Sequence, residues 1–323
     1  MSQRSCFVTG AYGLLGSWLV KGLLARGDKV TVLRRDRLPR SPLDLMGLEP
    51  EVAVVDGDVR DAAVLSRALS DYEIDTVYHL AAQALVQVAN RTPVPTFEAN
   101  MQGTWTVMEA VRLQEIPRTV VASSDKAYGP HDTLPYREDF ALQAKYPYDV
   151  SKAATDLVAR SYFHTFGVPV AVTRCANLYG GGDLNSSRLV PEVIRALFTG
   201  GRPVIRSDGS PERDYLYVED AVDAYLKITD GLDNGVAAGE AFNVGCGRPV
   251  SVLELVRTIA RAAGSDVEPD IQGTGTPNAE IDRQYVDVSK IRERCGWSPT
   301  VDLEDGVRRT IEWYRAHPDA LAS

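Results

Sequence analysis

The sequence predicts an α/β protein built on a doubly wound parallel sheet, followed by a smaller C-terminal α/β region. Three observations support this fold class. Short β-branched apolar runs alternate with helical patterns through the first half of the chain. A glycine-rich turn joins the first of these runs to a helix. From about Gly180 the alternation loosens, because glycines and prolines interrupt it.

Each predicted strand is a short apolar run bounded by turn residues, as expected for a strand buried on both faces. These runs are 6–9, 29–33, 52–55, 76–79, 119–123 and 170–173. The clearest helical patterns between them are 14–26, 62–69, 96–113 and 151–166. Alternation of this kind predicts a parallel sheet with right-handed crossovers and helices on both faces.

The length of 323 residues suggests about two structural units. We expect residues 1–180 to form the unit that contains the sheet, with residues 213–245 returning to it in part. Residues 181–212 and 246–323 are expected to form a smaller cap that binds the substrate.

The composition excludes several classes of protein. Hydrophobic residues make up 44% and charged residues 24%, which is typical of a globular chain. The net charge is −9 and no basic block occurs, so no nucleic-acid partner is expected. No apolar run is long enough for a membrane span, so we expect a cytoplasmic protein. Four cysteines lie far apart without a CxxC pair, which predicts neither disulfides nor a metal site.

The glycine-rich turn has the sequence TGAYGLLG at residues 9–16, directly between a predicted strand and a predicted helix. Gly10 permits the tight turn, Gly13 lets a pyrophosphate approach the backbone, and Gly16 lets the helix pack against the strand. The helix N-terminus then offers free N–H groups to phosphates. In this context the turn predicts a dinucleotide site; the alternative is three turn glycines without a ligand.

The GxxGxxG spacing resembles that of the extended short-chain dehydrogenase/reductases, the NAD-dependent epimerase/dehydratase family, which act largely on nucleotide sugars. The resemblance implies a Rossmann sheet and a tightly held nicotinamide cofactor. It also implies a homodimer formed through the helices at about 96–113 and 151–166. Besides the YxxxK pair described below, the cofactor contacts it implies are Gly10, Tyr12, Gly13, Leu14, Gly16, Arg34, Asp58, Val59, Leu80, Ala81 and Ala82.

The choice between NAD and NADP depends on the end of the second strand. An acidic residue there normally holds the ribose hydroxyls. Here the strand leads to Arg34 and Arg35, and Asp36 comes one step later. An arginine at this point can favour a 2′-phosphate, so we expect NAD and leave NADP open. The alternative is that both arginines are solvated loop residues.

Tyr148 and Lys152 form a YxxxK pair at the start of a helical pattern. Residues four apart share a helix face, so both side chains can enter one pocket. An ammonium beside a phenol is expected to lower the phenol's pKa, which would let Tyr148 remove a proton from a sugar hydroxyl. The family resemblance places Ser124 beside this pair and gives Asn100 a structural role.

Asp125 and Lys126 follow Ser124 directly, and they separate the reactions of the family. Family 4-epimerases usually carry small or neutral residues there, whereas 4,6-dehydratases carry an acid and a base. Ser124-Asp125-Lys126 resembles the Thr-Asp-Lys of CDP-glucose 4,6-dehydratases. On that reading Asp125 is an acid with a raised pKa and Lys126 is the base that removes the C5 proton. The alternative is an ion pair in a loop.

Further stretches resemble the CDP-glucose branch, although Arg213 to Val218 follows the general family form. The matching stretches are residues 16–19, 79–83 and 181–183. By the same resemblance Asn177 and Arg213 contact a nucleotide diphosphate, and Arg188 and Arg283 are further candidates. The alternatives are a turn asparagine and surface arginines.

The sequence therefore favours a nucleotide-sugar 4,6-dehydratase that uses NAD and releases water from the substrate. One alternative is a 4-epimerase that uses Tyr148 and Ser124 alone. A second is a cofactor-sensing regulator without turnover, which the intact YxxxK pair disfavours.

Overall fold

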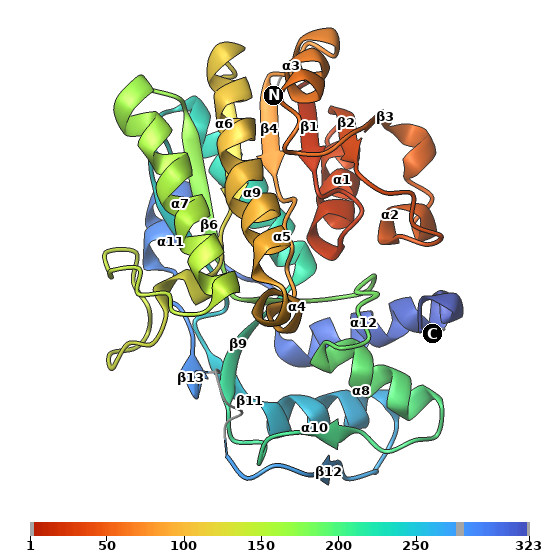
Figure 1. Cartoon of the computed structure of the whole chain (residues 1–323). Coiled ribbons are helices and arrows are strands. Elements are labelled where there is room, and N and C mark those ends of the chain that lie inside the picture. The colour runs from red at the N-terminus through yellow and green to blue at the C-terminus, as the bar shows by residue number, and fades with distance from the viewer. Residues whose placement is uncertain (1–2, 276–280, 322–323) are drawn as a thin grey trace.

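The structure is a computed structural model and describes residues 3–275 and 281–321 (Figure 1). One sheet of seven parallel strands has the order β10-β6-β5-β4-β1-β2-β3. The strands are β1 (Ser5–Thr9), β2 (Lys29–Arg34), β3 (Ala53–Asp56), β4 (Thr76–His79), β5 (Arg118–Ala122), β6 (Val170–Cys175) and β10 (Ala241–Val244). The fold class is confirmed, and six of these strands lie within two residues of their predicted bounds. The order in which strands are added reverses between β1 and β4, the position where open α/β sheets bind ligands.

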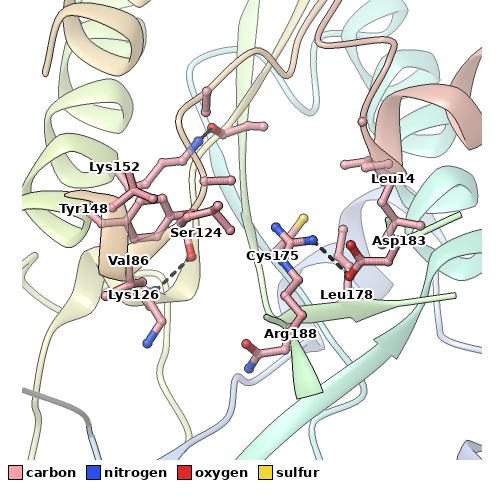
Figure 2. Close-up of a pocket in the computed structure, with 18 of the residues that line it drawn as sticks. Leu14, Val86, Ser124, Lys126, Tyr148, Lys152, Cys175, Leu178, Asp183 and Arg188 are labelled. Carbon is pink, nitrogen blue, oxygen red and sulfur yellow. Dashed lines mark hydrogen bonds and ion pairs between the residues drawn. The ribbon is translucent and has the colours of Figure 1, made fainter. Parts of the chain in front are cut away.

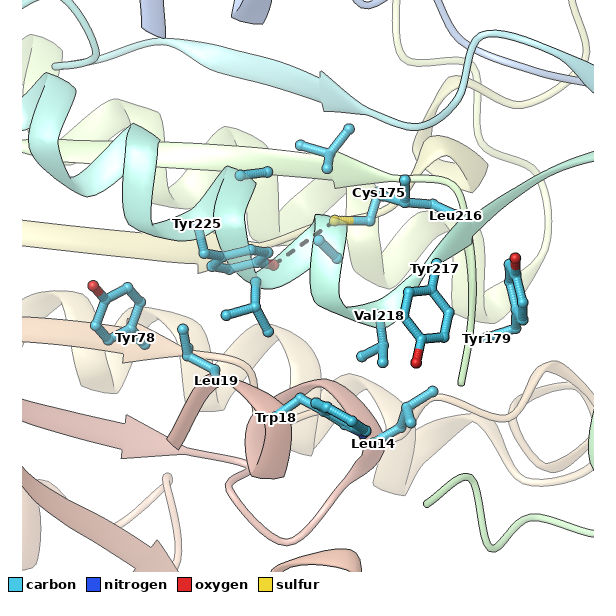
Figure 3. Packing of buried hydrophobic residues seen from close by; sticks show 14 of the residues in the cluster. Leu14, Trp18, Leu19, Tyr78, Cys175, Tyr179, Leu216, Tyr217, Val218 and Tyr225 are labelled. Carbon is cyan, nitrogen blue, oxygen red and sulfur yellow. Dashed lines mark hydrogen bonds between the residues drawn. The ribbon is translucent and has the colours of Figure 1, made fainter. Parts of the chain in front are cut away.

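Helices cover both faces of this sheet, and each face has its own hydrophobic core. On one face lie α1 (Leu14–Ala25), α9 (Val218–Asp233) and α11 (Ser289–Cys295); on the other lie α3 (Ala62–Asp71), α6 (Gly103–Leu113) and α7 (Pro147–Phe166). Figure 3 shows the first core, where Leu19 of α1 and Tyr225 of α9 both contribute buried side chains. The sheet is therefore doubly wound.

The predicted helix 96–113 is interrupted. The chain forms α5 (Pro93–Phe97), a π-helical segment η2 (Glu98–Gln102) and then α6. The side chain of Asn100 donates to Ser151 Oγ at 2.8 Å, and the backbone carbonyl oxygen of Asn100 accepts from the hydroxyls of Thr104 and Thr155. These side-chain bonds satisfy the backbone where the regular helix is broken, and they hold η2 against α7.

Helix α7 begins at Pro147, four residues before its predicted start. Proline suits the first helical position because its missing N–H has no partner there anyway. Tyr148 therefore lies in the first turn of the helix, one turn before Lys152.

The C-terminal part contains a second sheet of four strands, which β11, β9, β13 and β7 form. Only part of the segment 213–245 lies in the large sheet: β10 pairs with β6, whereas β9 belongs to the second sheet. The elements here are β7 (Asn177–Tyr179), α8 (Leu189–Phe198), β8 (Val204–Ile205), β9 (Glu212–Tyr217), β11 (Pro249–Ser251), α10 (Val252–Ala263), β12 (Asp270–Ile271), β13 (Arg283–Gln284) and α12 (Leu303–Ala316). The short elements α2 (Pro42–Leu45), η1 (Glu49–Glu51), α4 (Val86–Arg91), η3 (Asp125–Tyr128) and η4 (Pro318–Leu321) complete the fold.

The triple-glycine segment after β7 joins the two parts. Trp18 of α1 donates to the carbonyl oxygen of Gly181 at 2.7 Å. A Cβ on Gly181 would lie 2.1 Å from the ring of Trp313 in α12, so only glycine fits between the two tryptophans. This contact fixes the start of the segment that carries Asp183 and Arg188.

Within the described residues, no helix combines the length and apolarity that crossing a membrane requires.

Candidate active site

A cavity of about 1140 Å³ lies at the carboxyl ends of the central strands. Pockets for a single small ligand usually enclose about 300–1,000 Å³, so this cavity has room for more than one ligand. The glycine-rich turn lines one end, and residues of the C-terminal part line the other. In Figure 2, Ser124, Lys126 and Tyr148 lie together on one side, with Asp183 and Arg188 across the cavity.

The glycine-rich turn forms a cradle at the N-terminus of α1. Gly10 has a φ of +74°, and a Cβ there would lie 2.7 Å from the backbone nitrogen of Ala81. A Cβ on Gly16 would lie 2.1 Å from the carbonyl oxygen of Gly10, so the helix packs tightly on the turn. Gly13 precedes the helix without a capping side chain. Free N–H groups and close backbone approach together fit a pyrophosphate.

Most of the predicted cofactor contacts line this end of the cavity. They are Gly10, Tyr12, Gly13, Leu14, Gly16, Asp58, Val59, Leu80, Ala81 and Ala82. Arg35 and Asp36, which follow β2, line it as well.

Arg34 is the exception, because the structure does not bring it into the cavity. Its guanidinium donates to Asp56 at 3.0 Å and to Glu49 at 2.7 Å. Asp56 is its register partner on the neighbouring strand β3, so the two side chains meet beside the sheet. Arg34 is therefore paired with two carboxylates outside the cavity, and its contact with the cofactor stays a prediction.

The predicted catalytic residues come from two elements that face the same cavity. Ser124, Asp125 and Lys126 lie where β5 ends and η3 begins, and Tyr148 and Lys152 lie on α7. The Ser124 hydroxyl accepts from the backbone N–H of Lys126 at 3.2 Å and donates to Asp125 Oδ1 at 3.1 Å. Ser124 also lowers the pKa of the nearby Tyr148 phenol. Ser124 thus lies next to both the acid and the phenol.

The electrostatics of the YxxxK pair differ from the sequence prediction. Burial raises the pKa of Tyr148 to about 12, although Arg188 and Ser124 favour its ionised form. Lys152 donates to the carbonyl oxygen of Ala122 at 2.8 Å, and burial lowers its pKa to about 8. The predicted lowering of the phenol's pKa is therefore wrong for this structure, because removal from water outweighs the nearby positive charge.

Asp125 has the properties of a proton donor. Burial raises the pKa of this carboxyl to about 6, and Lys126, Ser124 and Arg213 reduce the rise without reversing it. Its second oxygen, Oδ2, is buried and has no hydrogen-bond partner. A buried carboxyl with an unpaired oxygen is suited to carry a proton toward a ligand. The predicted direction of this pKa shift agrees with the structure.

Asp149, which was not predicted from the sequence, lines the cavity beside Tyr148. It is 5% exposed; burial raises the pKa of its carboxyl to about 6, and Lys126 opposes the rise. Lys126 is therefore flanked by two acidic groups rather than one. The sequence did show an acidic residue between Tyr148 and Lys152. Its place beside the cavity becomes clear only once α7 is known to begin at Pro147.

Three of the four predicted substrate contacts line the opposite end of the cavity: Asn177, Arg188 and Arg213. Arg213 donates to the carbonyl oxygens of Glu212 and Asp282, and Arg188 pairs with Asp183 at 3.2 Å. Arg283 does not line the cavity. It pairs with Glu212, its register partner on β9, beside a separate surface hollow.

Comparison with known proteins identifies the family. A family model described as GDP-mannose 4,6 dehydratase matches residues 7–310. The chain belongs to this family. It is 32% identical over 318 residues to the dTDP-glucose 4,6-dehydratase of Mycolicibacterium smegmatis, across 96% of this chain and 93% of the relative. A dTDP-glucose 4,6-dehydratase of Streptomyces griseus is also 32% identical, over 320 residues, across 96% of this chain and 94% of the relative.

Solved structures of this family include two activities. The dTDP-glucose 4,6-dehydratase of Streptomyces venezuelae, solved with NAD bound, superposes with a TM-score of 0.86 at 30% identity, covering 97% of each chain. The UDP-glucose 4-epimerase of Thermotoga maritima, solved with UDP-glucose, gives 0.89 at 27% identity, covering 97% of this chain and 99% of the other. The shared fold therefore does not distinguish a dehydratase from an epimerase. The side chains of the site must distinguish the two activities.

Proposed function

We propose that the protein is a nucleotide-sugar 4,6-dehydratase, a lyase that converts a nucleotide hexose into its 4-keto-6-deoxy form. The buried Asp125 carboxyl, with its raised pKa and its unpaired Oδ2, carries the proposal. Dehydration needs an acid for the departing hydroxyl, whereas epimerisation at C4 needs none. The relatives named as dTDP-glucose 4,6-dehydratases support the same reaction class.

The residues of the site divide the reaction between them. Tyr148 takes the proton from the C4 hydroxyl of the sugar when its phenol is ionised, the form that Arg188 and Ser124 favour. Lys126 takes the C5 proton once C4 is a ketone. Asp125 gives its proton to the C6 hydroxyl, which leaves as water.

The cofactor that fits this site is NAD. The glycine cradle at α1 would hold its pyrophosphate, and Asp58 and Asp36 lie on the cavity wall beyond β3 and β2. Arg34, one of the two arginines that could select a 2′-phosphate, is paired with Asp56 and Glu49, and the other, Arg35, is paired with Asp36. When bound, NAD supplies the hydride acceptor at C4 and returns the hydride to C6.

The C-terminal part is proposed to hold the nucleotide diphosphate. Arg213 and Arg188 present guanidinium groups to the end of the cavity away from the glycine cradle, and Asn177 lies between the two parts. Guanidinium groups suit bidentate contact with phosphate. On this view the unit with the large sheet binds the cofactor and the cap binds the substrate.

We also propose that the chain forms a homodimer through α6 and α7. These helices lie side by side on the outside of the molecule (Figure 1). Large apolar side chains on them face solvent, although each helix already buries another face: Trp105 is 47% exposed and Leu157 is 58% exposed. An apolar strip across two neighbouring helices fits an interface.

The test is mass spectrometry of the purified protein incubated with NAD and a panel of dTDP-, UDP-, CDP- and GDP-hexoses. We expect one substrate to lose the mass of one water. Lys126→Ala should slow that loss about 10²–10⁴-fold, the usual contribution of a general base. Lys145→Ala, which removes an exposed lysine of the loop before α7, is the matched control and should leave the rate unchanged.

Other outcomes would redirect the proposal. A product of unchanged mass but altered chromatographic retention would indicate a 4-epimerase. The structural similarity to a UDP-glucose 4-epimerase supports this alternative. In that case Lys126→Ala should retain activity while Tyr148→Phe loses it. Cofactor binding without turnover of any nucleotide hexose would favour the regulator.

A further inference from the structure

A buried polar cluster lies behind the proposed active site. Arg174 on β6 is 1% exposed and forms a two-pronged ion pair with Asp156, at 2.8 and 3.2 Å. The same guanidinium donates to the Tyr128 hydroxyl at 2.8 Å and lies 4.8 Å from the centre of the tyrosine ring. Tyr128 in turn donates to Asn243 Oδ1 at 2.7 Å. None of these four side chains is among the residues that line the cavity.

The cluster connects the two elements that carry the proposed chemistry. Tyr128 is the last residue of η3, two positions after Lys126. Asp156 lies on α7, four positions after Lys152 and on the same helix face. Arg174 also donates to the backbone oxygen of Glu138, in the loop between η3 and α7. One side chain therefore contacts both catalytic elements and the loop that joins them.

A buried ion pair is a poor source of stability, because removal of both charges from water offsets their attraction. Such groups can instead fix one arrangement of the elements that they join. Here the arrangement concerns reacting groups, since Asp125 and Lys126 must reach the same sugar that Tyr148 contacts.

We propose that Arg174 and Tyr128 are positioning residues that set η3 against α7, and so place Asp125 and Lys126 for the elimination step. This inference rests on the proposed dehydratase function. It predicts that loosening η3 impairs elimination while C4 oxidation, which Tyr148 and Ser124 support from α7 and the end of β5, continues.

The test uses Tyr128→Phe in the full-length protein. This variant keeps the ring that packs on Arg174 and removes only the hydroxyl that joins Arg174 to Asn243. Arg174→Ala is avoided, because it would leave the buried Asp156 carboxylate with only the longer contact to Arg160, at 3.7 Å. Tyr78→Phe is the matched control: its buried hydroxyl accepts from Thr229 on the far side of β4, away from the cavity.

The first measurement needs no sugar. The titration midpoint of the Asp125 carboxyl is followed by NMR of ¹³C-labelled aspartate and assigned with Asp125→Asn. If η3 shifts, the carboxyl meets water and its midpoint falls from about 6 toward 3.8 in Tyr128→Phe but not in Tyr78→Phe. The titratable groups around it are unchanged in both variants: Lys126, Tyr136, Tyr148, Cys175, Arg213 and Asp214.

The second measurement separates the two half-reactions. In single turnovers Tyr128→Phe should accumulate reduced nicotinamide, because elimination slows about 100-fold, the effect of misplacing a reacting group by roughly 1 Å. An Asp125 midpoint that matches the control's overturns the positioning role. Failure of the wild-type protein to dehydrate any nucleotide hexose overturns the proposed function instead, and the titration still decides whether Tyr128 positions η3.

Discussion

At the scale of single residues, Asp125 shows how a reactive group is kept at the expense of stability. The folded protein holds a carboxyl in a site that disfavours its charge, which raises its pKa from 3.8 to about 6. The native state therefore keeps a proton that the unfolded chain has already released across that pH range. The free energy of unfolding falls as the pH rises from about 4 to about 6, and the loss persists at neutral pH.

Asp125→Asn should therefore stabilise the protein at pH 7. Asparagine imitates the neutral carboxyl, and a shift of about two pKa units corresponds to about 3 kcal/mol. At pH 4 the gain should vanish, because the wild-type carboxyl is then protonated as well. Urea unfolding at the two pH values measures the difference, and dehydration should be lost at both.

An exposed carboxyl provides the control for this experiment. Asp139→Asn alters a side chain that is 68% exposed, so its effect should stay within about 0.5 kcal/mol at either pH. Equal effects of the two substitutions at pH 7 would contradict the assignment of a destabilising, buried carboxyl at position 125.

At this scale helix spacing predicted that Tyr148 and Lys152 share one pocket, and the family resemblance placed Ser124 beside them. All three side chains line the cavity. The sequence did not predict that Arg34 pairs with Asp56, because that contact depends on the register between two strands. It also misjudged the pKa of Tyr148, since desolvation is set by everything packed around the ring.

At the scale of elements, the two glycines that begin α1 have separate roles. A Cβ on Gly16 would collide with the backbone of Gly10 and Ala11, whereas a Cβ on Gly13 would meet only one atom at an ordinary 3.5 Å. Gly16 is therefore required by the fold itself. Gly13 is required only by a ligand that approaches the turn.

The pair Gly16→Ala and Gly13→Ala tests this division. Gly16→Ala should lower the free energy of unfolding by 1 kcal/mol or more, roughly the range of overpacking in a tight site. Gly13→Ala should unfold like the wild-type protein and bind NAD at least about tenfold more weakly. Urea unfolding and calorimetric titration with NAD measure the two effects. Unchanged NAD affinity in Gly13→Ala would contradict the cradle.

The boundaries of elements were harder to predict than their existence. The pattern over 96–113 indicated one helix, but the bonds of Asn100 to Ser151 and Thr155, far along the chain, interrupt it. Similarly, the start of α7 at Pro147 became visible only in the structure. Both differences bring residues toward the cavity, so local pattern failed where tertiary contacts shape the site.

At the scale of the whole molecule, the large sheet followed from local pattern because six of its strands are short apolar runs in regular alternation with helices. The position of the seventh strand, β10, in the strand order of the sheet could not be predicted from the sequence. It joins β6 after the chain has passed through a second sheet, and that pairing is decided by packing between distant segments. The two sheets meet at the cavity. The C-terminal part, whose strands were predicted least well from the sequence pattern, therefore completes the site.

The outer surface of α6 and α7 carries the last prediction. A stable interface buries about 1,200–2,000 Å², and removing one charged side chain from water within it costs several kcal/mol. Leu157→Glu, at the exposed centre of α7, should therefore convert a dimer into a monomer in analytical ultracentrifugation. Phe198→Glu, an exposed apolar residue on α8 in the C-terminal part, should leave the dimer intact. A wild-type chain that sediments as a monomer at micromolar concentration would refute the proposed interface.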